Sequence, residues 1–166
     1  MAIYSHSKAA STLAAGFYRT ADLALKNCNL NTGGKYTSSV AMAVTSIANA
    51  AFACEVALKS HLPFNTQGHN LKALFEQLDD SEKRAFKNDI IRENPKSFNQ
   101  PSQIDNMFDQ LLEQCKDNFQ LSRYIYEGAT KRTDFPIWFM MTLTRHLLMA
   151  QGFGFDNSYQ IISEPF

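Results

Sequence analysis

The stretch Ser38–Leu62, which reads SSVAMAVTSIANAAFACEVALKSHL, decides the fold class of this chain. Its larger apolar residues recur at steps of three and four, which is the period of an α-helix and excludes a strand. These residues are Val40, Val44, Ile47, Ala51, Cys54, Leu58 and Leu62. Alanines fill much of the remaining circumference, as expected of a helix that packs against several neighbours. We therefore expect a central helix here, ended by Pro63.

Another helical pattern precedes this central stretch. We expect a helix over Ser7–Asn27, because apolar residues follow one another at four-residue steps. Leu13, Phe17, Ala21 and Leu25 are expected on its inner face. The polar, glycine-containing segment that follows ends the helix.

Two short helices are expected after Pro63. Asn70 is a suitable N-cap for the first, because its side chain accepts hydrogen bonds from the unpaired N–H groups of a first turn. The inward-facing residues of that helix are expected to be Leu71, Leu74, Phe75 and Leu78. Asp80 or Ser81 caps the second short helix, which extends through Ile91.

The second half of the chain carries two more long patterns. A helix is expected over Ser102–Glu127, with Gly128 as its stop. The last helix is expected to open at Asp134 and Pro136 and to close at Gly152. Its inward-facing residues are expected to be Ile137, Met140, Met141, Leu143, Leu147 and Leu148. The tail, residues 153–166, shows no periodicity.

These patterns predict an all-α fold. We expect an up-and-down helical bundle of four main helices, with two short helices inserted between the second and the third. The 166 residues are enough for one hydrophobic core. The chain is therefore expected to form a single helical domain over residues 1–166, with a tail of uncertain structure.

Composition limits the classes of partner. Sixteen Lys and Arg balance sixteen Asp and Glu, which weakens any broad electrostatic binding of nucleic acid or anionic lipid. The three cysteines, Cys28, Cys54 and Cys115, show no paired spacing and are expected to be reduced and buried. No signal-like N-terminus and no apolar run of about 20 residues is evident. We therefore expect a cytoplasmic protein with no membrane partner.

Two charged residues fall on apolar helical faces. Glu55 lies at the edge of the central stripe, where an unpaired carboxylate costs several kcal/mol. Lys59, one turn on, can pair with it. Arg123, in the segment FQLSRYIYEG, is a better partner from another helix, flanked by Tyr124 and Tyr126. The pair is either a buried structural ion pair or part of an anion pocket, and the sequence does not separate the two.

His69 stands at the start of the first short helix. It either fixes the loop by hydrogen bonds or presents a polar group at the mouth of the bundle. His6, His61 and His146 show no ligand spacing with one another or with a cysteine, so we expect no metal site. No glycine-rich phosphate loop or nucleophile motif is present, and no cofactor is expected.

Three segments together resemble the HEPN superfamily. They are AFACEVALKSHL, GHNLKALFEQL and FQLSRYIYEG, in that order. The resemblance covers about residues 10 to 150 and maps onto Glu55, Lys59, His69, Arg123, Tyr124, Tyr126 and Glu127 as candidate binding residues. It implies a bundle that commonly dimerises, a link to prokaryotic defence or toxin–antitoxin systems, and a nucleotidyltransferase-type protein partner.

The chain departs from the ribonuclease motif of that superfamily. Many members cleave RNA without metal, using an arginine and a histidine four to six residues apart. Arg123 is followed by no histidine in that window, Glu127 stands near the expected position, and Arg145 directly precedes His146. No catalytic residue is therefore assigned.

Three functions remain open at this stage. The first is a non-catalytic module that binds a nucleotide, RNA or a protein partner. The second is a metal-independent endoribonuclease with an atypical Arg/Glu/His site at a dimer interface. The third is a structural interaction protein whose polar cluster only fixes the register of the helices.

Overall fold

Helices make up most of the regular structure in this computed structural model, which describes residues 2–28, 36–94, 104–118, 120 and 136–165. The helices are α1 (Ala2–Lys26), α2 (Tyr36–Ser60), α3 (Leu71–Glu76), α4 (Asp80–Glu93), α5 (Ile104–Cys115) and α7 (Ile137–Ala150). Two short strands follow, β1 (Gly154–Phe155) and β2 (Ile161–Ser163). The all-α helical bundle expected from the sequence is confirmed.

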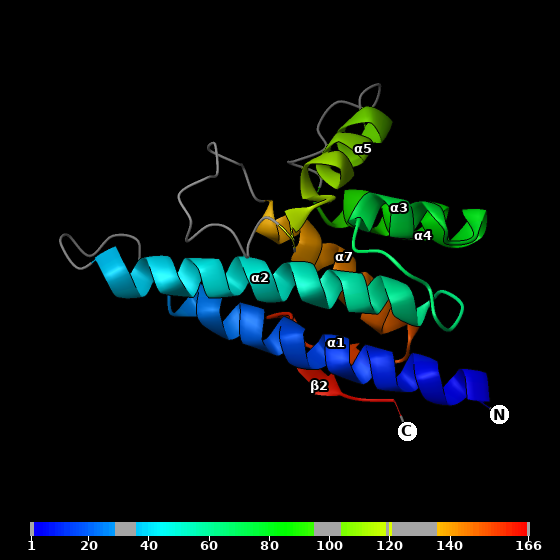
Figure 1. The fold of residues 1–166 in the computed structure, drawn as a ribbon, viewed down its shortest axis with the longest axis horizontal. Coiled ribbons are helices and arrows are strands. Elements are labelled where there is room, and N and C mark those ends of the chain that lie inside the picture. The colour runs from blue at the N-terminus through cyan, green and yellow to red at the C-terminus, as the bar shows by residue number, and fades with distance from the viewer. Residues whose placement is uncertain (1, 29–35, 95–103, 119, 121–135, 166) are drawn as a thin grey trace.

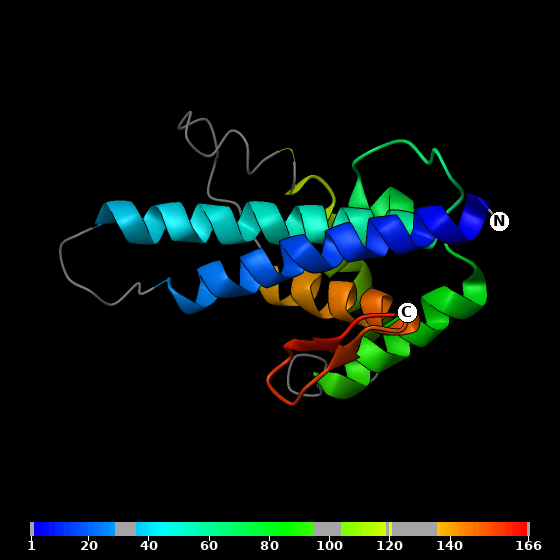
Figure 2. The same ribbon diagram turned by 90° about the horizontal axis from the view of Figure 1, so that it is seen from below.

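The two longest helices form the backbone of the bundle. α1 and α2 run antiparallel and side by side, and α7 lies against both of them (Figures 1 and 2). α3 and α4 come between α2 and α5 in the chain and pack at one end of the long pair. The C-terminal strands lie beside α1 (Figure 2).

α2 is the central helix, as the sequence predicts. It contacts α1, α3 and α7. Residues of its apolar stripe are buried, including Val44, Ile47, Cys54 and Leu58. Small buried residues such as Ala50 and Ala57 let the neighbouring helices approach closely. The core lies around this helix.

The expectation that no apolar run is long enough to span a membrane is wrong for α2. Residues Ala41–Ser60 form a stretch that is long and apolar enough to cross a membrane, although 56% of it is buried inside the chain. A buried core helix passes the same test. Cytoplasmic localisation stays a prediction.

The inner face of α1 differs from the expected one. Leu13 is 51% exposed and Leu25 is 37% exposed, so the prediction that both face the core is wrong. The buried positions are mostly small, and they are Ser11, Ala14, Ala15, Tyr18, Ala21 and Ala24. A close approach of α1 to α2 needs small residues at the contact, which turns the larger leucines outward.

The short helices fall close to where the sequence puts them. Asn70 caps α3, since its side chain accepts a hydrogen bond of 2.9 Å from the Ala73 N–H. Leu71, Leu74, Phe75 and Leu78 are all buried, as expected. The N-cap position of α4 is Asp79 instead of Asp80 or Ser81, and its side chain makes no capping hydrogen bond.

α5 ends earlier than expected. The helix predicted to run on to Glu127 stops at Cys115. The Lys116 carbonyl, just past this end, accepts a hydrogen bond of 3.0 Å from the Leu71 N–H at the start of α3. Lys116 and Asp117 form a turn, and Asn118 and Gln120 are again helical, so the predicted helix is interrupted after Cys115. The remainder of the predicted helix, residues 121–127, lies outside the described residues.

Aromatic rings and a glycine cap hold α7 in place. The Phe108 ring of α5 contacts Phe75 of α3 and Phe139 of α7, with ring centroids 5.4 and 5.3 Å apart. Gly152 follows the helix with φ of 91°, and the N–H groups of Gly152 and Phe153 donate to the Met149 and Leu148 carbonyls. This is a Schellman motif, and it confirms Gly152 as the stop. Asp134 lies outside the described residues.

The tail folds into a structure that the sequence does not predict. β1 and β2 pair antiparallel, and the segment packs along α1. The Tyr18 hydroxyl donates to the Tyr159 carbonyl at 3.1 Å, and Gln160 donates to the Asp22 carboxylate at 3.0 Å. The tail is therefore a hairpin docked onto the bundle.

Candidate functional site

Glu55 is the buried acid at the centre of the predicted site. Its side chain is 2% exposed, because α2 carries it into the core one residue after Cys54. One carboxylate oxygen, Oε1, accepts from Lys59 Nζ at 2.8 Å and from His69 Nδ1 at 2.9 Å. The structure therefore brings Glu55, Lys59 and His69 together, and we call these three residues the Glu55 cluster.

The second carboxylate oxygen of Glu55 is different. Oε2 is buried and has no hydrogen-bond partner in the part of the chain that the structure describes. A buried acceptor that lacks a donor is unfavourable by about 1–3 kcal/mol. The Glu55 cluster thus holds one carboxylate oxygen without a described donor, beside the oxygen that Lys59 and His69 share.

Local structure fixes the other members of the Glu55 cluster. Lys59 lies one helical turn after Glu55, which allows an i, i+4 pair. His69 immediately precedes Asn70, and the cap that Asn70 makes anchors this end of the loop to α3. The His69 side chain is 51% exposed and that of Lys59 is 23% exposed. The cluster therefore reaches from the core to the surface.

This geometry defines what the Glu55 cluster can do chemically. The contact between Nδ1 and Glu55 fixes the orientation of the His69 ring. A lysine and a histidine fixed on one carboxylate are a preorganised donor pair for a phosphate or carboxylate. A carboxylate that orients a histidine is also the arrangement used in general acid–base catalysis.

Four of the sequence-predicted site residues cannot be placed. Arg123, Tyr124, Tyr126 and Glu127 lie outside the described residues. The expected pairing of Arg123 with Glu55 stays a prediction. Lys59 fills the role expected of a local partner, and His69 fills that of a loop-fixing residue.

A second charged cluster was not predicted from the sequence. Arg145 of α7 is 5% exposed and forms an ion pair with Glu93 at the end of α4. His146 Nε2 lies 2.8 Å from the other Glu93 oxygen. The Arg145 guanidinium also stacks 3.9 Å from the centre of the Tyr159 ring. These residues form the Glu93 cluster, which ties α4, α7 and the hairpin together.

The electrostatics of the Glu93 cluster are those of a compensated ion pair. Burial alone raises the pKa of Glu93, but the hydrogen bonds and charges of Arg145 and His146 outweigh it, and the pKa is lowered. Burial raises the pKa of Tyr18 to about 12, although Arg145 opposes this. Both oxygens of Glu93 are engaged. The sequence signal for this cluster is that two polar residues, Arg145 and His146, stand side by side in an otherwise apolar helix.

Lysine and arginine side chains also line a groove between α3, α4 and α5. Its volume is about 600 Å³, and Phe75, Phe108 and Leu112 form its floor. Lys83 pairs with Asp80 at 2.7 Å, and Lys87 lies 3.7 Å from Asp109. These acids neutralise the groove, so we assign no anion site to it.

The described residues contain no group of three or more His, Cys, Asp or Glu side chains that could hold a metal ion. Cys54 and Cys115 are buried, as expected, whereas Cys28 is only partly buried. Burial raises the pKa of the Cys54 thiol to about 12 and also raises that of Cys115. Neither buried thiol is a candidate nucleophile.

Comparison with known proteins adds no assignment, since no family model, no curated protein and no solved structure matches this chain.

Proposed function

We propose that this chain is a non-catalytic, HEPN-like helical module that binds an anionic group of RNA or of a nucleotide at the Glu55 cluster. The observation that supports this is the fixing of Lys59 and His69 on one oxygen of a buried carboxylate. Both donors are held before any ligand arrives, which lowers the entropy lost on binding.

The net charge of the Glu55 cluster determines how many phosphate groups it can bind. Glu55 and Lys59 neutralise each other, so the site becomes cationic when His69 is protonated. A neutral-to-singly-charged site suits one phosphate rather than a long polyanion. Binding is then expected to depend weakly on salt, with a slope of about −1 in log K against log salt.

The resemblance to HEPN domains supports the wider setting. A role in a prokaryotic defence or toxin–antitoxin system, with a nucleotidyltransferase-type partner, belongs to this proposal. Co-expression of the chain with a neighbouring nucleotidyltransferase, followed by co-purification, tests that partner.

Binding of a fluorescent single-stranded RNA by polarisation tests the site itself. Wild type is expected to bind, and Lys59→Gln and His69→Ala are each expected to weaken binding about tenfold. Lys26→Gln is the matched control, because Lys26 also forms an i, i+4 ion pair, with Asp22 in the last turns of α1. Absence of RNA binding by the wild type, or equal loss in the control, contradicts the proposal. Circular dichroism checks that each variant folds.

One observation favours a second function, the metal-independent endoribonuclease. The Glu55 Oε1 to His69 Nδ1 contact of 2.9 Å orients the imidazole as a general acid or base requires. Incubation of RNA with the protein in EDTA distinguishes the two functions. Cleavage by wild type that is lost in His69→Ala supports the nuclease, whereas binding without cleavage supports the module.

A further inference from the structure

His61 is a buried histidine at the point where three helices meet. It follows Ser60, the last residue of α2, and its side chain is 4% exposed. Its ring packs edge to face on the Phe86 ring of α4, with the centroids 5.5 Å apart. Nδ1 lies 3.0 Å from Glu82 Oε1 in the first turn of α4. Nε2 lies 3.0 Å from the carbonyl oxygen of Leu147, in the last turn of α7.

Both polar partners of this ring are hydrogen-bond acceptors. An ionised carboxylate and a backbone carbonyl accept hydrogen bonds and donate none. A neutral imidazole carries one N–H and one lone pair, so in one of the two contacts a lone pair of the ring would face an oxygen. Only the imidazolium, with a proton on each nitrogen, donates to Glu82 and to Leu147 at the same time. The observed arrangement is therefore that of a protonated His61.

The end of α7 favours the same charge. The last carbonyls of a helix lack partners within the helix and form the negative end of its dipole, so a cation placed there is stabilised. The last turn of α7 contains no basic residue of its own. His61 comes from α2 and, when protonated, supplies that cation. The same charge compensates Glu82.

Other charged side chains of α4 and α7 have contacts elsewhere. Lys83 pairs with the Asp80 carboxylate at 2.7 Å, and Arg84 donates to the Asp80 carbonyl at 3.1 Å. Arg145 and His146 belong to the Glu93 cluster, at the other end of α4. Of the charged groups described on these two helices, Glu82 is therefore the one that contacts His61.

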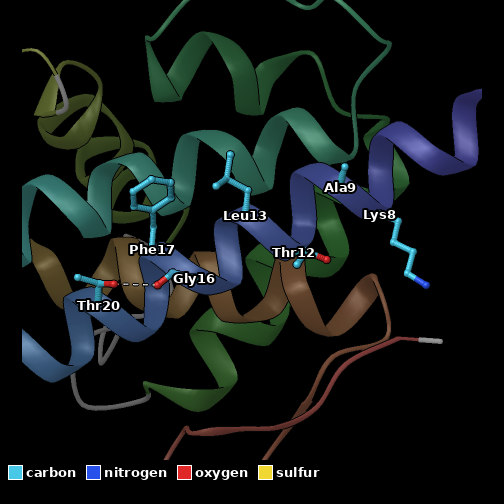
Figure 3. A pocket seen from close by; sticks show the side chains of 7 residues that line it. All are labelled: Lys8, Ala9, Thr12, Leu13, Gly16, Phe17 and Thr20. Atoms are coloured by element: carbon cyan, nitrogen blue, oxygen red, sulfur yellow. Dashed lines mark hydrogen bonds between the residues drawn. The ribbon is translucent and has the colours of Figure 1, made fainter.

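The charged and titratable groups of α1 and α2 at this end of the bundle also lie apart from His61. Lys59 pairs with Glu55 at 2.8 Å. The His6 ring packs on Phe64, and Lys8 lines a hollow on the surface of α1 (Figure 3). The charge of the imidazole is thus determined by Glu82 and by the end of α7.

α4 is the helix that depends on this contact. Of its fourteen residues, Phe86 and Ile90 are buried. Polar contacts hold its two ends, since His61 contacts the first turn and Arg145 contacts Glu93 at the last residue. Elements with few buried apolar contacts open more readily than the rest of a protein. Loss of one end contact is therefore felt first in α4.

We propose that His61 is a pH-sensitive latch that holds the first turn of α4 against the end of α7. The protonated ring links Glu82 to the Leu147 carbonyl. A ring that has lost one proton donates only once. The Leu147 carbonyl is fixed in α7, whereas the Glu82 side chain is 35% exposed and can turn to water, so the contact with Glu82 is the one that breaks.

The direction of the switch follows from the charge. The latch is closed in mild acid and opens as the pH rises through the ordinary imidazole range, about pH 5–8. This inference does not depend on the function proposed for the Glu55 cluster, because His61, Glu82 and Leu147 are not part of it.

Hydrogen exchange of the whole chain at about pH 5.5 and about pH 8.5, expressed as protection relative to the unfolded chain at each pH, tests the latch. Protection of the α4 amides is expected to fall about tenfold from the lower to the higher pH, whereas that of α1 stays constant. Glu82→Gln is expected to remove the pH dependence, because an amide also donates and so pairs with an unprotonated Nδ1. Since Glu82 is partly exposed, this variant is expected to fold.

His146→Gln is the matched control. His146 Nε2 contacts a single acceptor, Glu93, at 2.8 Å. A neutral ring serves that contact by placing its one proton on Nε2. The variant is therefore expected to keep the pH dependence of wild type.

Nitrogen-15 NMR of the histidine rings reads the protonation state directly, with His61 assigned through its contact with Phe86. Two N–H groups are expected on the His61 ring at about pH 5.5 and one at about pH 8.5. A ring that carries one proton at the lower pH, or two at the higher pH, overturns the proposal. Equal protection of α4 at both pH values, or an unchanged pH dependence in Glu82→Gln, also overturns it.

Discussion

Replacement of Glu93 by glutamine is expected to destabilise the fold strongly, although no ligand contact is involved. The change leaves the Arg145 guanidinium in place at 6% side-chain exposure and removes the charge that compensates it. Loss of one partner from a buried ion pair costs about 3–5 kcal/mol. The Glu93 side chain is 25% exposed, so water offsets part of this cost. The cation–π contact of Arg145 with Tyr159 is the same in wild type and variant, so it does not enter the difference.

With the partial exposure of Glu93 taken into account, the net loss for Glu93→Gln is about 2–4 kcal/mol. A domain of this size is stable by about 5–15 kcal/mol, so the variant is expected to fold with a much smaller margin. Urea unfolding followed by circular dichroism measures the change, and the slope against urea is expected to stay constant. The corresponding fall in melting temperature is about 4–16 °C.

Asp89→Asn provides the matched control on the same helix. Asp89 pairs with Arg92 at 2.7 Å, but the Arg92 side chain is 81% exposed, so the pair contributes less than about 0.5 kcal/mol. If Glu93→Gln cost no more than Asp89→Asn, Glu93 would not be what stabilises the buried Arg145. The double variant Glu93→Leu with Arg145→Met is expected to recover most of the stability, because it removes both charges from the site.

The remaining predictions concern stability at low pH, two glycine substitutions and the labelling of cysteines. Because the pKa of Glu93 is lowered in the folded state, ionised Glu93 stabilises the fold above its ordinary pKa of 4.5. This stability is lost as the pH falls through the lowered pKa. The urea midpoint is therefore expected to fall less steeply with acid in Glu93→Gln than in wild type. Gly152 has φ of 91°, so Gly152→Ala is expected to destabilise the protein by about 1 kcal/mol in urea unfolding. Gly16→Ala in the middle of α1 is expected to stabilise it, because the added methyl meets no described atom. Because Cys54 and Cys115 are buried with raised thiol pKa values, a thiol reagent is expected to label one cysteine per native chain and three in denaturant.

The fold could be predicted wherever local sequence and tertiary packing agree. In α2 the apolar stripe and the buried stripe coincide, because this helix is covered on several sides and its large residues fill the core. Gly152 could be predicted because its role depends on backbone conformation alone. Such features need no knowledge of distant residues.

The fold could not be predicted where a distant contact overrides the local pattern. The rule that large apolar residues face inward fails in α1, since close packing against α2 selects Ala14 and Ala21 and leaves Leu13 outside. Where α5 ends, the Lys116 carbonyl accepts a hydrogen bond from the Leu71 N–H, which lies far away in the sequence. The hairpin has no periodic pattern, and contacts such as Gln160 with Asp22 hold it in place.

The candidate site shows the same division. Glu55 and Lys59 could be paired from their spacing alone, and His69 was singled out by its place at the start of the first short helix, but its contact with Glu55 was not predicted. Arg145 was not foreseen as a buried cation, because its partner Glu93 lies 52 residues earlier on another helix. Spacing within one segment carries no information about such a pair.

The two charged clusters differ in a way that separates structure from function. In the Glu93 cluster the buried group is the arginine, and the carboxylate uses both oxygens, one on Arg145 and one on His146. In the Glu55 cluster the buried group is the acid, one of its oxygens lacks a described donor, and its histidine is half exposed. A saturated ion pair gains nothing from a ligand, because every new contact must first break an existing one. In the Glu55 cluster, Lys59 and His69 are held on one buried oxygen and still reach the surface, and this difference in exposure is the physical reason to look for an anion at Glu55.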